Sequence, residues 1–424
     1  MADSLTLPRL EDLSDPKFDA FAMERQMRGA FDDPYPIFEK LRREGTVHKG
    51  DILPLFTDIP DVQLGKLPHY AVFGYDACLR VLNDGETFTN REVFMHSLGQ
   101  SFGRTITVMD GAEHARLRKV LQKAFLPNVV ARWGDSLVAP VVDRLMNRFI
   151  ASGRADLVED YTHHFPFQIV YSMLLLSDEE APVFHKLAVA QLLSSAGMPQ
   201  GPEATRKLGD FFAAMLAQRR ANPGDDLVSH LATVEVDGER LEDEVLISFL
   251  RQLINAGGDT TYRSTSVLLA CLLREPELYE EVRRDRSLIP QAIEEALRWD
   301  GPVTRTYRWC TKDTEIDGVT IPAGSVVDVV LGSANRDPTK YENPDKFDIH
   351  RPRTVRHLAF VAGPHICVGQ HLARVEMTRA LEAVLDRLPN LRLDPAMSPP
   401  RIIGHVLRSP DHIYVRFDPA APVG

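Results

Sequence analysis

The stretch Phe360-Val361-Ala362-Gly363-Pro364-His365-Ile366-Cys367-Val368-Gly369 decides how this sequence is interpreted. It places Cys367 in a glycine-rich turn, directly before a helix predicted over about 368–387. Backbone N–H groups of the turn and the positive end of the helix both favour the thiolate over the thiol. Such a thiolate is a suitable axial ligand for heme iron. A structural buried cysteine beside a helix cap is the alternative.

The spacing within this stretch resembles the heme-binding loop of the cytochrome P-450 superfamily, F-[G/S]-x-G-x-[H/R]-x-C-x-G. The matching residues are Phe360, Gly363, His365, Cys367 and Gly369. Val361 departs from the pattern, because the family usually has Gly or Ser at that position. The resemblance implies that Cys367 is the iron ligand and that Phe360 and Gly369 shape the heme-binding loop.

A second stretch, Glu295-Ala296-Leu297-Arg298, is similar to the E-x-x-R helix signature of the same superfamily. By itself the pattern is weak, since an acid and a base three residues apart are commonly an exposed helix pair. In that superfamily the pair is buried and contacts the irregular segment before the cysteine. Residues 335–353, which contain three prolines, resemble that segment. The resemblance therefore implies a structural role for Glu295 and Arg298.

A third stretch, residues 110–118, resembles the early helix that holds the heme propionates in the superfamily. His114 and Arg118 are four residues apart and share a helix face, so two donors are available for a carboxylate. A solvated basic helix face is the alternative. Arg308 follows Pro302-Val303 at the place of another propionate-binding arginine, and His365 fits the same role. The implied cofactor is heme b, iron protoporphyrin IX.

The longest predicted helix, over about 242–274, is apolar on most faces and is interrupted by Ala256-Gly257-Gly258-Asp259-Thr260-Thr261. Two adjacent glycines cost about 1 kcal/mol each relative to alanine, which predicts a local distortion. A simple packing contact is the alternative. The stretch looks like the superfamily signature A-G-x-[D/E]-T-T. It implies a groove for dioxygen and a catalytic pair, Asp259 and Thr260, that delivers protons; Asp and Thr capping a broken helix is the alternative.

Composition restricts the function further. The 424 residues include 49 Lys plus Arg against 60 Asp plus Glu, a net charge of -11, which argues against binding to nucleic acid or to an anionic membrane. The first twenty residues lack the basic start and apolar core of a secretory signal, and no apolar run approaches the roughly 18 residues of a membrane span. The four cysteines are too far apart for a zinc or disulfide framework. We expect a soluble cytoplasmic protein.

The patterning predicts a mainly α fold with a smaller β portion. Strand-like stretches occur near 69–73, 311–330 and 413–415, and residues 84–109 are predicted to form a long loop. The simplest organisation is one heme-thiolate monooxygenase domain over 1–424. The resemblance implies the cytochrome P-450 fold, with heme between the long central helix and the cysteine loop.

The implied activity is that of a bacterial-type heme-thiolate monooxygenase, which uses O2 and two electrons to hydroxylate a hydrophobic substrate. A terpenoid, aromatic or steroid compound of small to medium size is expected. Because the chain ends soon after its last predicted helix, electrons are expected from a separate ferredoxin with its reductase, or from a flavodoxin. Basic residues expected to face an acidic partner are Arg116, Lys119, Lys123, Arg353 and Arg374; solvated surface charge is the alternative.

By resemblance, the distal pocket is lined by the 84–109 loop, the helix near Ala256, the segment after Pro302 and the turn near Val406. The first of these offers Phe94, Met95, Leu98 and Phe102, and the third offers Val303 and Thr306. His96, Arg305 and His405 are candidates for recognising a polar end of the substrate, although surface positions are the alternative for each.

Three other functions remain open from the sequence. A peroxide-driven peroxygenase shares the fold and the ligand, but it typically lacks the acid–alcohol pair that Asp259 and Thr260 form. A non-catalytic heme-thiolate sensor or carrier needs no proton delivery. A nucleophilic Cys367 paired with His365 has no separate motif to support it.

Overall fold

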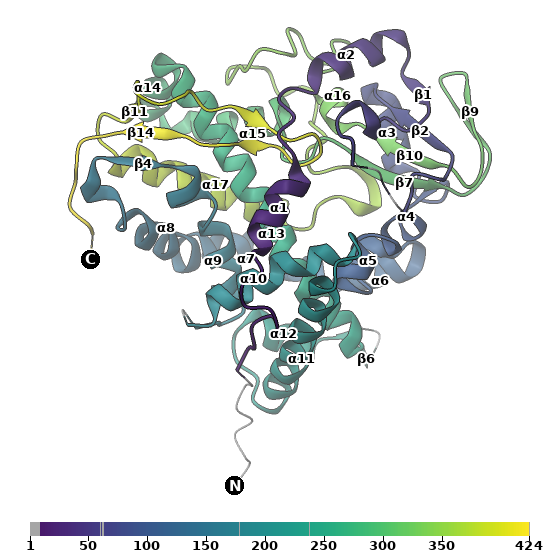
Figure 1. Ribbon diagram of the computed structural model, residues 1–424, viewed down its shortest axis with the longest axis horizontal. Coiled ribbons are helices and arrows are strands. Elements are labelled where there is room, and N and C mark those ends of the chain that lie inside the picture. Colours follow the sequence, from purple (N-terminus) through teal and green to yellow (C-terminus); the bar gives the residue numbers. More distant parts are fainter. Residues whose placement is uncertain (1–8, 60, 62, 178, 237, 424) are drawn as a thin grey trace. The chain divides into compact units, whose positions relative to one another are not determined.

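The computed structural model describes residues 9–423 except 60, 62, 178 and 237. The chain forms two compact units. Figure 1 shows the ribbon, coloured by residue number from the N-terminus to the C-terminus. The first unit contains the described residues of Met1–Met27, Asn90–Leu126 and Phe167–Gly258. The second contains those of Arg28–Thr89, Pro127–Pro166 and Asp259–Gly424. One of the boundaries between the two units falls inside the longest helix, α13 (Asp243–Arg274).

The first unit is built mainly from helices. Its helices are α4 (Arg91–Met95), α5 (Leu98–Phe102), η2 (Ile106–Val108), α6 (Gly111–Ala124), α10 (Ala181–Gln191), η6 (Leu192–Ser194), α11 (Gln200–Ala221) and α12 (Leu227–Thr233). It also contains most of α1 (Ala20–Arg28) and of α9 (Phe165–Met173), the first half of α13, and a hairpin of β5 (Glu235–Val236) and β6 (Glu239–Arg240). α10 packs on α11, where the Phe184 ring meets those of Phe211 and Phe212 edge-on at 6.2 and 5.8 Å between centroids. An aromatic cluster therefore joins α10 to α11.

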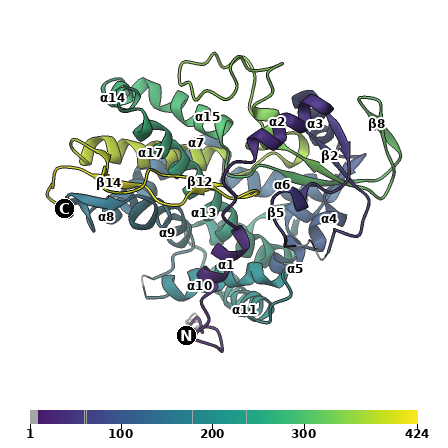
Figure 2. The ribbon, with the colours of Figure 1, turned by 45° about the horizontal axis from the view of Figure 1, so that its top comes forward.

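The second unit contains the largest sheet, with strand order β1-β2-β10-β7-β3. Its strands are β1 (Val47–Lys49), β2 (His69–Val72), β3 (Phe88–Thr89), β7 (Thr306–Cys310) and β10 (Val326–Val329). β2 and β10 are parallel and the other pairs are antiparallel. Two helices, α2 (Tyr35–Glu44) and α3 (Tyr75–Asn83), lie beside the sheet (Figure 2), and Phe38 of α2 packs against Phe73 and Val330.

The rest of the second unit consists of helices and small sheets. Its helices are η1 (Leu53–Leu55), α7 (Pro127–Trp133), α8 (Ala139–Met146), η4 (Ile150–Ser152), α14 (Pro276–Arg284), η7 (Arg286–Leu288), α15 (Ile289–Trp299), α16 (Leu331–Asn335), η8 (Gly363–His365) and α17 (Gln370–Arg387), with π-helical turns η3 (Gly134–Val138) and η5 (Val158–Thr162). Its strands are β4 (Arg154–Asp156), β8 (Thr314–Ile316), β9 (Val319–Ile321), β11 (Arg392–Leu393), β12 (Ile402–Ile403), β13 (Ser409–Pro410) and β14 (Tyr414–Arg416). α8 lies beside α17 in both views (Figures 1 and 2), where Arg387 Nη1 donates to Asp143 Oδ1 at 2.8 Å.

The predicted mainly α fold with a smaller β portion is confirmed, and so are the helices expected over 242–274 and 368–387. The stretch 110–118 lies mostly in α6 (Gly111–Ala124). The prediction of a loop over 84–109 is wrong, because this segment holds β3, α4, α5 and η2. Each helix of that segment is about one turn long, too short to show a hydrophobic period. The prediction of one domain over 1–424 stays a prediction. Across the part of the chain that the structure describes, none of the helices combines the length and hydrophobicity of a membrane span.

The predicted interruption of the long helix is also wrong, because α13 continues through residues 256–261. Within the first unit, a Cβ atom at Gly258 would clash with the Phe167 ring, and a Cβ at Gly257 would lie 3.0 Å from Val170. The glycines therefore let α9 approach the backbone of α13 closely. The packing contact that the sequence left open accounts for them without any break in the helix.

Candidate active site

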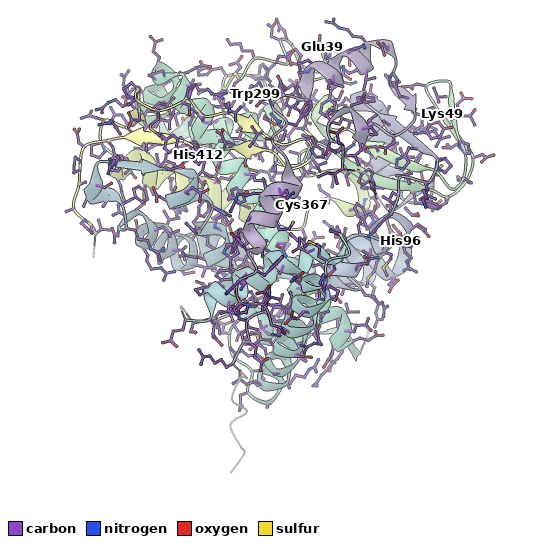
Figure 3. The ribbon with its side chains drawn as sticks, viewed as in Figure 1. Glu39, Lys49, His96, Trp299, Cys367 and His412 are labelled. Atoms are coloured by element: carbon purple, nitrogen blue, oxygen red, sulfur yellow. The ribbon has the colours of Figure 1, made fainter. Side chains whose placement is uncertain are left out.

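Cys367 lies in the loop between η8 and α17 of the second unit and is labelled in Figure 3. Its N–H donates to the carbonyl of Phe360 at 3.0 Å, and the N–H of Ile366 donates to the carbonyl of Gly363 at 3.2 Å. The side chain is half-buried, and a Cβ built on Gly369 would lie 3.9 Å from the cysteine Sγ. The sulfur therefore sits in a closed turn just before the positive end of an 18-residue helix.

Two backbone conformations shape this cysteine loop. Gly363 has φ +69°, and a Cβ there would clash with the carbonyl oxygen of Leu82 in α3, so glycine is required for both reasons. Val361 has φ +53°, in the left-handed region, which for a β-branched residue costs on the order of 1–3 kcal/mol. Its partly buried side chain packs against the core cluster that includes Leu82. Packing in this cluster offsets part of the strain.

The other cysteines differ from Cys367 in their environment. All four cysteines are free thiols in the structure. Cys78, Cys271 and Cys310 are buried, and burial raises the pKa of each of these thiols above its ordinary value. They therefore remain protonated at neutral pH, whereas Cys367 is the half-buried one, beside a helix N-terminus.

The predicted structural role of Glu295 and Arg298 is confirmed. Arg298 donates from Nε and Nη2 to the two carboxylate oxygens of Glu295 at 2.8 and 2.7 Å, and both side chains are buried. Nη1 of Arg298 also donates to the carbonyls of Asn335 and Pro344 at 2.9 and 2.8 Å. The Asn335 side chain in turn accepts the N–H of Leu358 at 2.6 Å. The pair thus holds the irregular segment that leads into the cysteine loop.

A further network beside the cysteine loop was missed from the sequence. Glu294 accepts Nε of Arg374 at 2.6 Å and hydrogen-bonds Nε2 of His357 at 3.2 Å. The Arg374 guanidinium lies 4.5 Å from the centroid of the Phe360 ring. Burial alone would raise the pKa of Glu294, but hydrogen bonds from His357 and Arg374 outweigh it and lower this pKa to about 2. Glu294 therefore compensates the charge of Arg374, which weakens the prediction that Arg374 attracts an acidic partner.

Asp259 and Thr260 are the first residues that α13 contributes to the second unit. Both oxygens of Asp259 accept from a buried arginine, Arg263: Nε donates to Oδ2 at 3.0 Å and Nη2 to Oδ1 at 2.8 Å. Thr261, which follows Thr260, forms a side-chain hydrogen bond with Glu376 of α17. Burial raises the pKa of Glu376 well above its ordinary value. Sequence reasoning missed Arg263, although an acid and an arginine four residues apart on an otherwise apolar helix are the signal that could have found it.

The predicted propionate ligands lie on three elements. In the first unit, α6 carries a buried His114 and a partly buried Arg118. In the second unit, Arg308 of β7 is buried, with Nη1 donating to the preceding carbonyl at 2.7 Å. His365 is half-buried and belongs to the same loop as Cys367. The structure thus places His114 with Arg118 on one helix, and His365 with the cysteine.

Two segments predicted to line the pocket adjoin in the second unit. Thr304 N–H donates to the carbonyl of Val406 at 2.9 Å, and Arg408 N–H donates to that of Pro302 at 3.0 Å. Arg305, for which a surface position was the alternative, is buried and donates from Nη1 to Asp328 Oδ2 at 2.8 Å. In the first unit, the four apolar residues expected from the 84–109 segment belong to α4 and α5.

Comparison with known proteins decides the family. A family model described as cytochrome P-450 matches residues 173–417. This chain belongs to the cytochrome P-450 family. The steroid C26-monooxygenase of Mycobacterium tuberculosis is 35% identical over 325 residues, which cover 74% of this chain and 86% of that protein. The cytochrome P-450 monooxygenase PikC of Streptomyces venezuelae is 32% identical over 374 residues, 85% of each chain.

Solved structures agree with this assignment. CYP109E1 of Bacillus megaterium, in a complex with testosterone, has a TM-score of 0.79 at 27% identity and covers 91% of this chain and 99% of that one. The predicted cytochrome P-450 fold is therefore confirmed.

As a member of this family, the protein is a monooxygenase whose cofactor is heme b. The residues of the second unit fit this cofactor. A thiolate is a soft ligand that suits iron, and Cys367 is the cysteine that is only half-buried and lies just before a helix N-terminus. Arg308 and His365 are the residues of this unit that would donate hydrogen bonds to a propionate carboxylate.

Proposed function

We propose that this cytochrome P-450 hydroxylates a hydrophobic organic molecule of small to medium size, with Cys367 as the axial ligand of the heme iron. The observation that carries the proposal is the cysteine loop. The Cys367 N–H is bonded to the Phe360 carbonyl, α17 begins three residues later, and the buried Arg298 holds the segment before the loop. These contacts hold the sulfur in one position, as a metal ligand requires.

Each group of site residues has its own role in the proposed reaction. Heme b supplies the activation of dioxygen and the transfer of one oxygen atom to a C–H bond. Phe360 and Gly369 shape the loop around the sulfur. Asp259 and Thr260 deliver protons from solvent. The propionates are bound by His114, Arg118, Arg308 and His365.

A steroid is the substrate class that the similar proteins support best. The M. tuberculosis relative is named as a steroid monooxygenase, and the B. megaterium structure holds testosterone. Terpenoid and aromatic compounds are the other classes, and they belong in the same test. The test is a titration of the purified heme-loaded protein with testosterone first, followed by terpenoids and aromatics, for the spin-state shift that substrate binding beside the heme iron would produce.

The electrons come from a separate ferredoxin with its reductase, or from a flavodoxin. Three basic residues of the first unit support an acidic partner, because Arg116, Lys119 and Lys123 are exposed at spacings that place them on one face of α6. Lys119→Glu should slow the ferredoxin-dependent reduction of the heme, whereas Lys40→Glu, an exposed lysine of α2, should not. Equal reduction rates for the two variants would contradict docking at α6.

The ligand assignment is tested by the absorption spectrum of the dithionite-reduced protein with carbon monoxide. A long-wavelength Soret band is expected for the wild type, because it reports a thiolate on iron. Cys367→Ala should lose this band. Cys310→Ala, which changes a buried thiol outside the loop, should keep it. A wild type without the band, or a Cys367→Ala protein that retains it, would overturn the proposed function.

A further inference from the structure

We propose that Arg263 is a positioning residue for the reaction, which fixes the carboxylate of Asp259 in the orientation from which protons are delivered. The inference rests on the proposed function, in which Asp259 and Thr260 supply protons. It adds a residue that the family signature A-G-x-[D/E]-T-T, which ends at Thr261, does not include.

Arg263 is held in place by its surroundings. Its side chain is fully buried, with 0% of its surface exposed. The guanidinium carbon lies 4.8 Å from the centroid of the Tyr262 ring, and Nη1 lies 3.4 Å from Oγ of Ser409 in β13. An arginine packed in this way has little freedom to follow a moving partner. Asp259 therefore adapts to Arg263, and the arginine sets the position of the acid.

The ion pair fixes Asp259 without blocking it. Nε and Nη2 of Arg263 each bond one carboxylate oxygen, so the carboxylate plane is aligned with the guanidinium fork. Each oxygen retains a second lone-pair site. The Asp259 side chain is 23% exposed, so water can reach it. The result is a carboxylate of fixed orientation that keeps part of its surface accessible.

The stoichiometry shows why orientation matters here. Monooxygenation converts R–H, O2, two electrons and two protons into R–OH and water. The hydrogen removed from carbon ends in the new hydroxyl group, so both protons of the water must come from the medium. When they arrive at the wrong oxygen, the same two electrons and two protons leave as hydrogen peroxide and R–H is unchanged. Misplacing Asp259 therefore diverts turnover to peroxide.

The unequal burial of the pair predicts unequal effects on stability. Removing Asp259 takes away the carboxylate that pairs with a fully buried cation, whereas removing Arg263 leaves a carboxylate that water can hydrate. Asp259→Asn should lower the melting temperature by roughly 5 °C, and Arg263→Met should lower it less. The double variant Arg263→Met/Asp259→Asn should recover most of the loss. This readout needs no turnover.

The functional test compares Arg263→Met and Arg263→Lys with the wild type in the holoenzyme, driven by NADH through ferredoxin and its reductase with testosterone present. The readouts are hydrogen peroxide formed per NADH and hydroxylated testosterone formed per NADH. Arg263→Met should raise the peroxide yield and change its solvent isotope effect, with product per NADH falling on the order of tenfold. Arg263→Lys keeps the charge but cannot form the two-bond fork, so it should rescue only partly.

Two controls separate positioning from general damage. Arg387→Gln breaks an ion pair of the same length, Arg387 Nη1 to Asp143 Oδ1 at 2.8 Å, on α17 and α8. It should lower stability without raising the peroxide yield. Turnover driven by added hydrogen peroxide already carries its protons, so Arg263→Met should retain it.

The outcomes distinguish this inference from the proposed function. If Asp259→Asn raises the peroxide yield and Arg263→Met does not, Asp259 delivers protons and the role of Arg263 is wrong. If neither variant changes the yield or its isotope effect, the proton-delivery role of Asp259 fails as well. If Arg263→Lys has the peroxide yield of the wild type, the positive charge at position 263 is sufficient and the positioning role is overturned. An elevated yield in both variants, with partial rescue by lysine, supports it.

Discussion

Glu294 of α15 and Arg374 of α17 form an ion pair with an Nε–Oε1 distance of 2.6 Å and an Nη2–Oε2 distance of 3.1 Å. α15 carries the E-x-x-R signature, and α17 begins just after Cys367. The Arg374 guanidinium also lies over the Phe360 ring, and the backbone carbonyl of Phe360 accepts the Cys367 N–H. One ion pair thus connects the helix that holds the irregular segment to both ends of the cysteine loop.

This pair predicts a specific dependence of stability on acid. The pKa of Glu294 falls from its ordinary 4.5 to about 2 in the folded protein, so the folded state binds the proton more weakly than the unfolded one. The stabilisation is present above about pH 4.5 and is lost as the pH falls toward 2. Glu294→Gln should lower the free energy of unfolding by up to about 3 kcal/mol at pH 7. As the pH falls below 4.5, the Glu294→Gln protein should lose less stability than the wild type, as measured by urea titration at each pH. Parallel curves of stability against pH for the two proteins would contradict the assignment.

The E-x-x-R pair should be far more sensitive to mutation than a surface pair of the same spacing. Arg298→Ala removes both charge-assisted bonds of the guanidinium fork from the buried Glu295, which then retains only Arg351 Nε at 3.2 Å and the Asp348 N–H at 2.9 Å. The loss costs up to about 3–5 kcal/mol and should prevent recovery of heme-loaded protein. Glu280 and Arg283 in α14 have the same i,i+3 spacing, but both are exposed. Glu280→Ala should leave the unfolding midpoint almost unchanged. Heme content and urea unfolding measure both, and equal losses would contradict the structural role.

The sequence predicted those parts of the site that depend on local spacing. Cys367 in its turn, and the acid and arginine of α15, are recognisable because their geometry is set within a few residues. What could not be predicted depends on partners far away in the chain. The glycines of α13 suggested a broken helix, and only the Phe167 ring against Gly258 explains them as packing. The Asn335 side chain that holds Leu358 has no local pattern at all.

Steric fit and backbone conformation can be separated at two glycines with positive φ. Gly363→Ala adds a Cβ that clashes with the Leu82 carbonyl, in addition to the strain of φ +69°. Gly318 has φ +80°, but no described atom lies within 4 Å of its Cβ position. Gly318→Ala should cost only about 1–2 kcal/mol. Gly363→Ala should displace the loop and abolish the long-wavelength Soret band with carbon monoxide. Retention of that band in Gly363→Ala would show that the loop tolerates the shift.

At position 361, the positive φ predicts that the glycine variant is more stable than the alanine variant, which reverses the usual order of stability. At an ordinary backbone position glycine is less stable than alanine by roughly 0.5–1 kcal/mol, because it loses more freedom on folding. At φ +53° alanine instead carries a left-handed penalty of about 1–2 kcal/mol that glycine avoids. Both substitutions remove the same side chain from the core cluster, so the lost packing cancels in their comparison.

Val361→Gly should therefore unfold at a higher urea concentration than Val361→Ala, by a difference of up to about 1 kcal/mol in the free energy of unfolding. Val355 provides the matched control, because it packs against the same cluster and does not have a positive φ. There the alanine variant should be the more stable of the two. If alanine is also the more stable at position 361, the valine is not held in the left-handed conformation, and the cysteine loop keeps its shape without backbone strain.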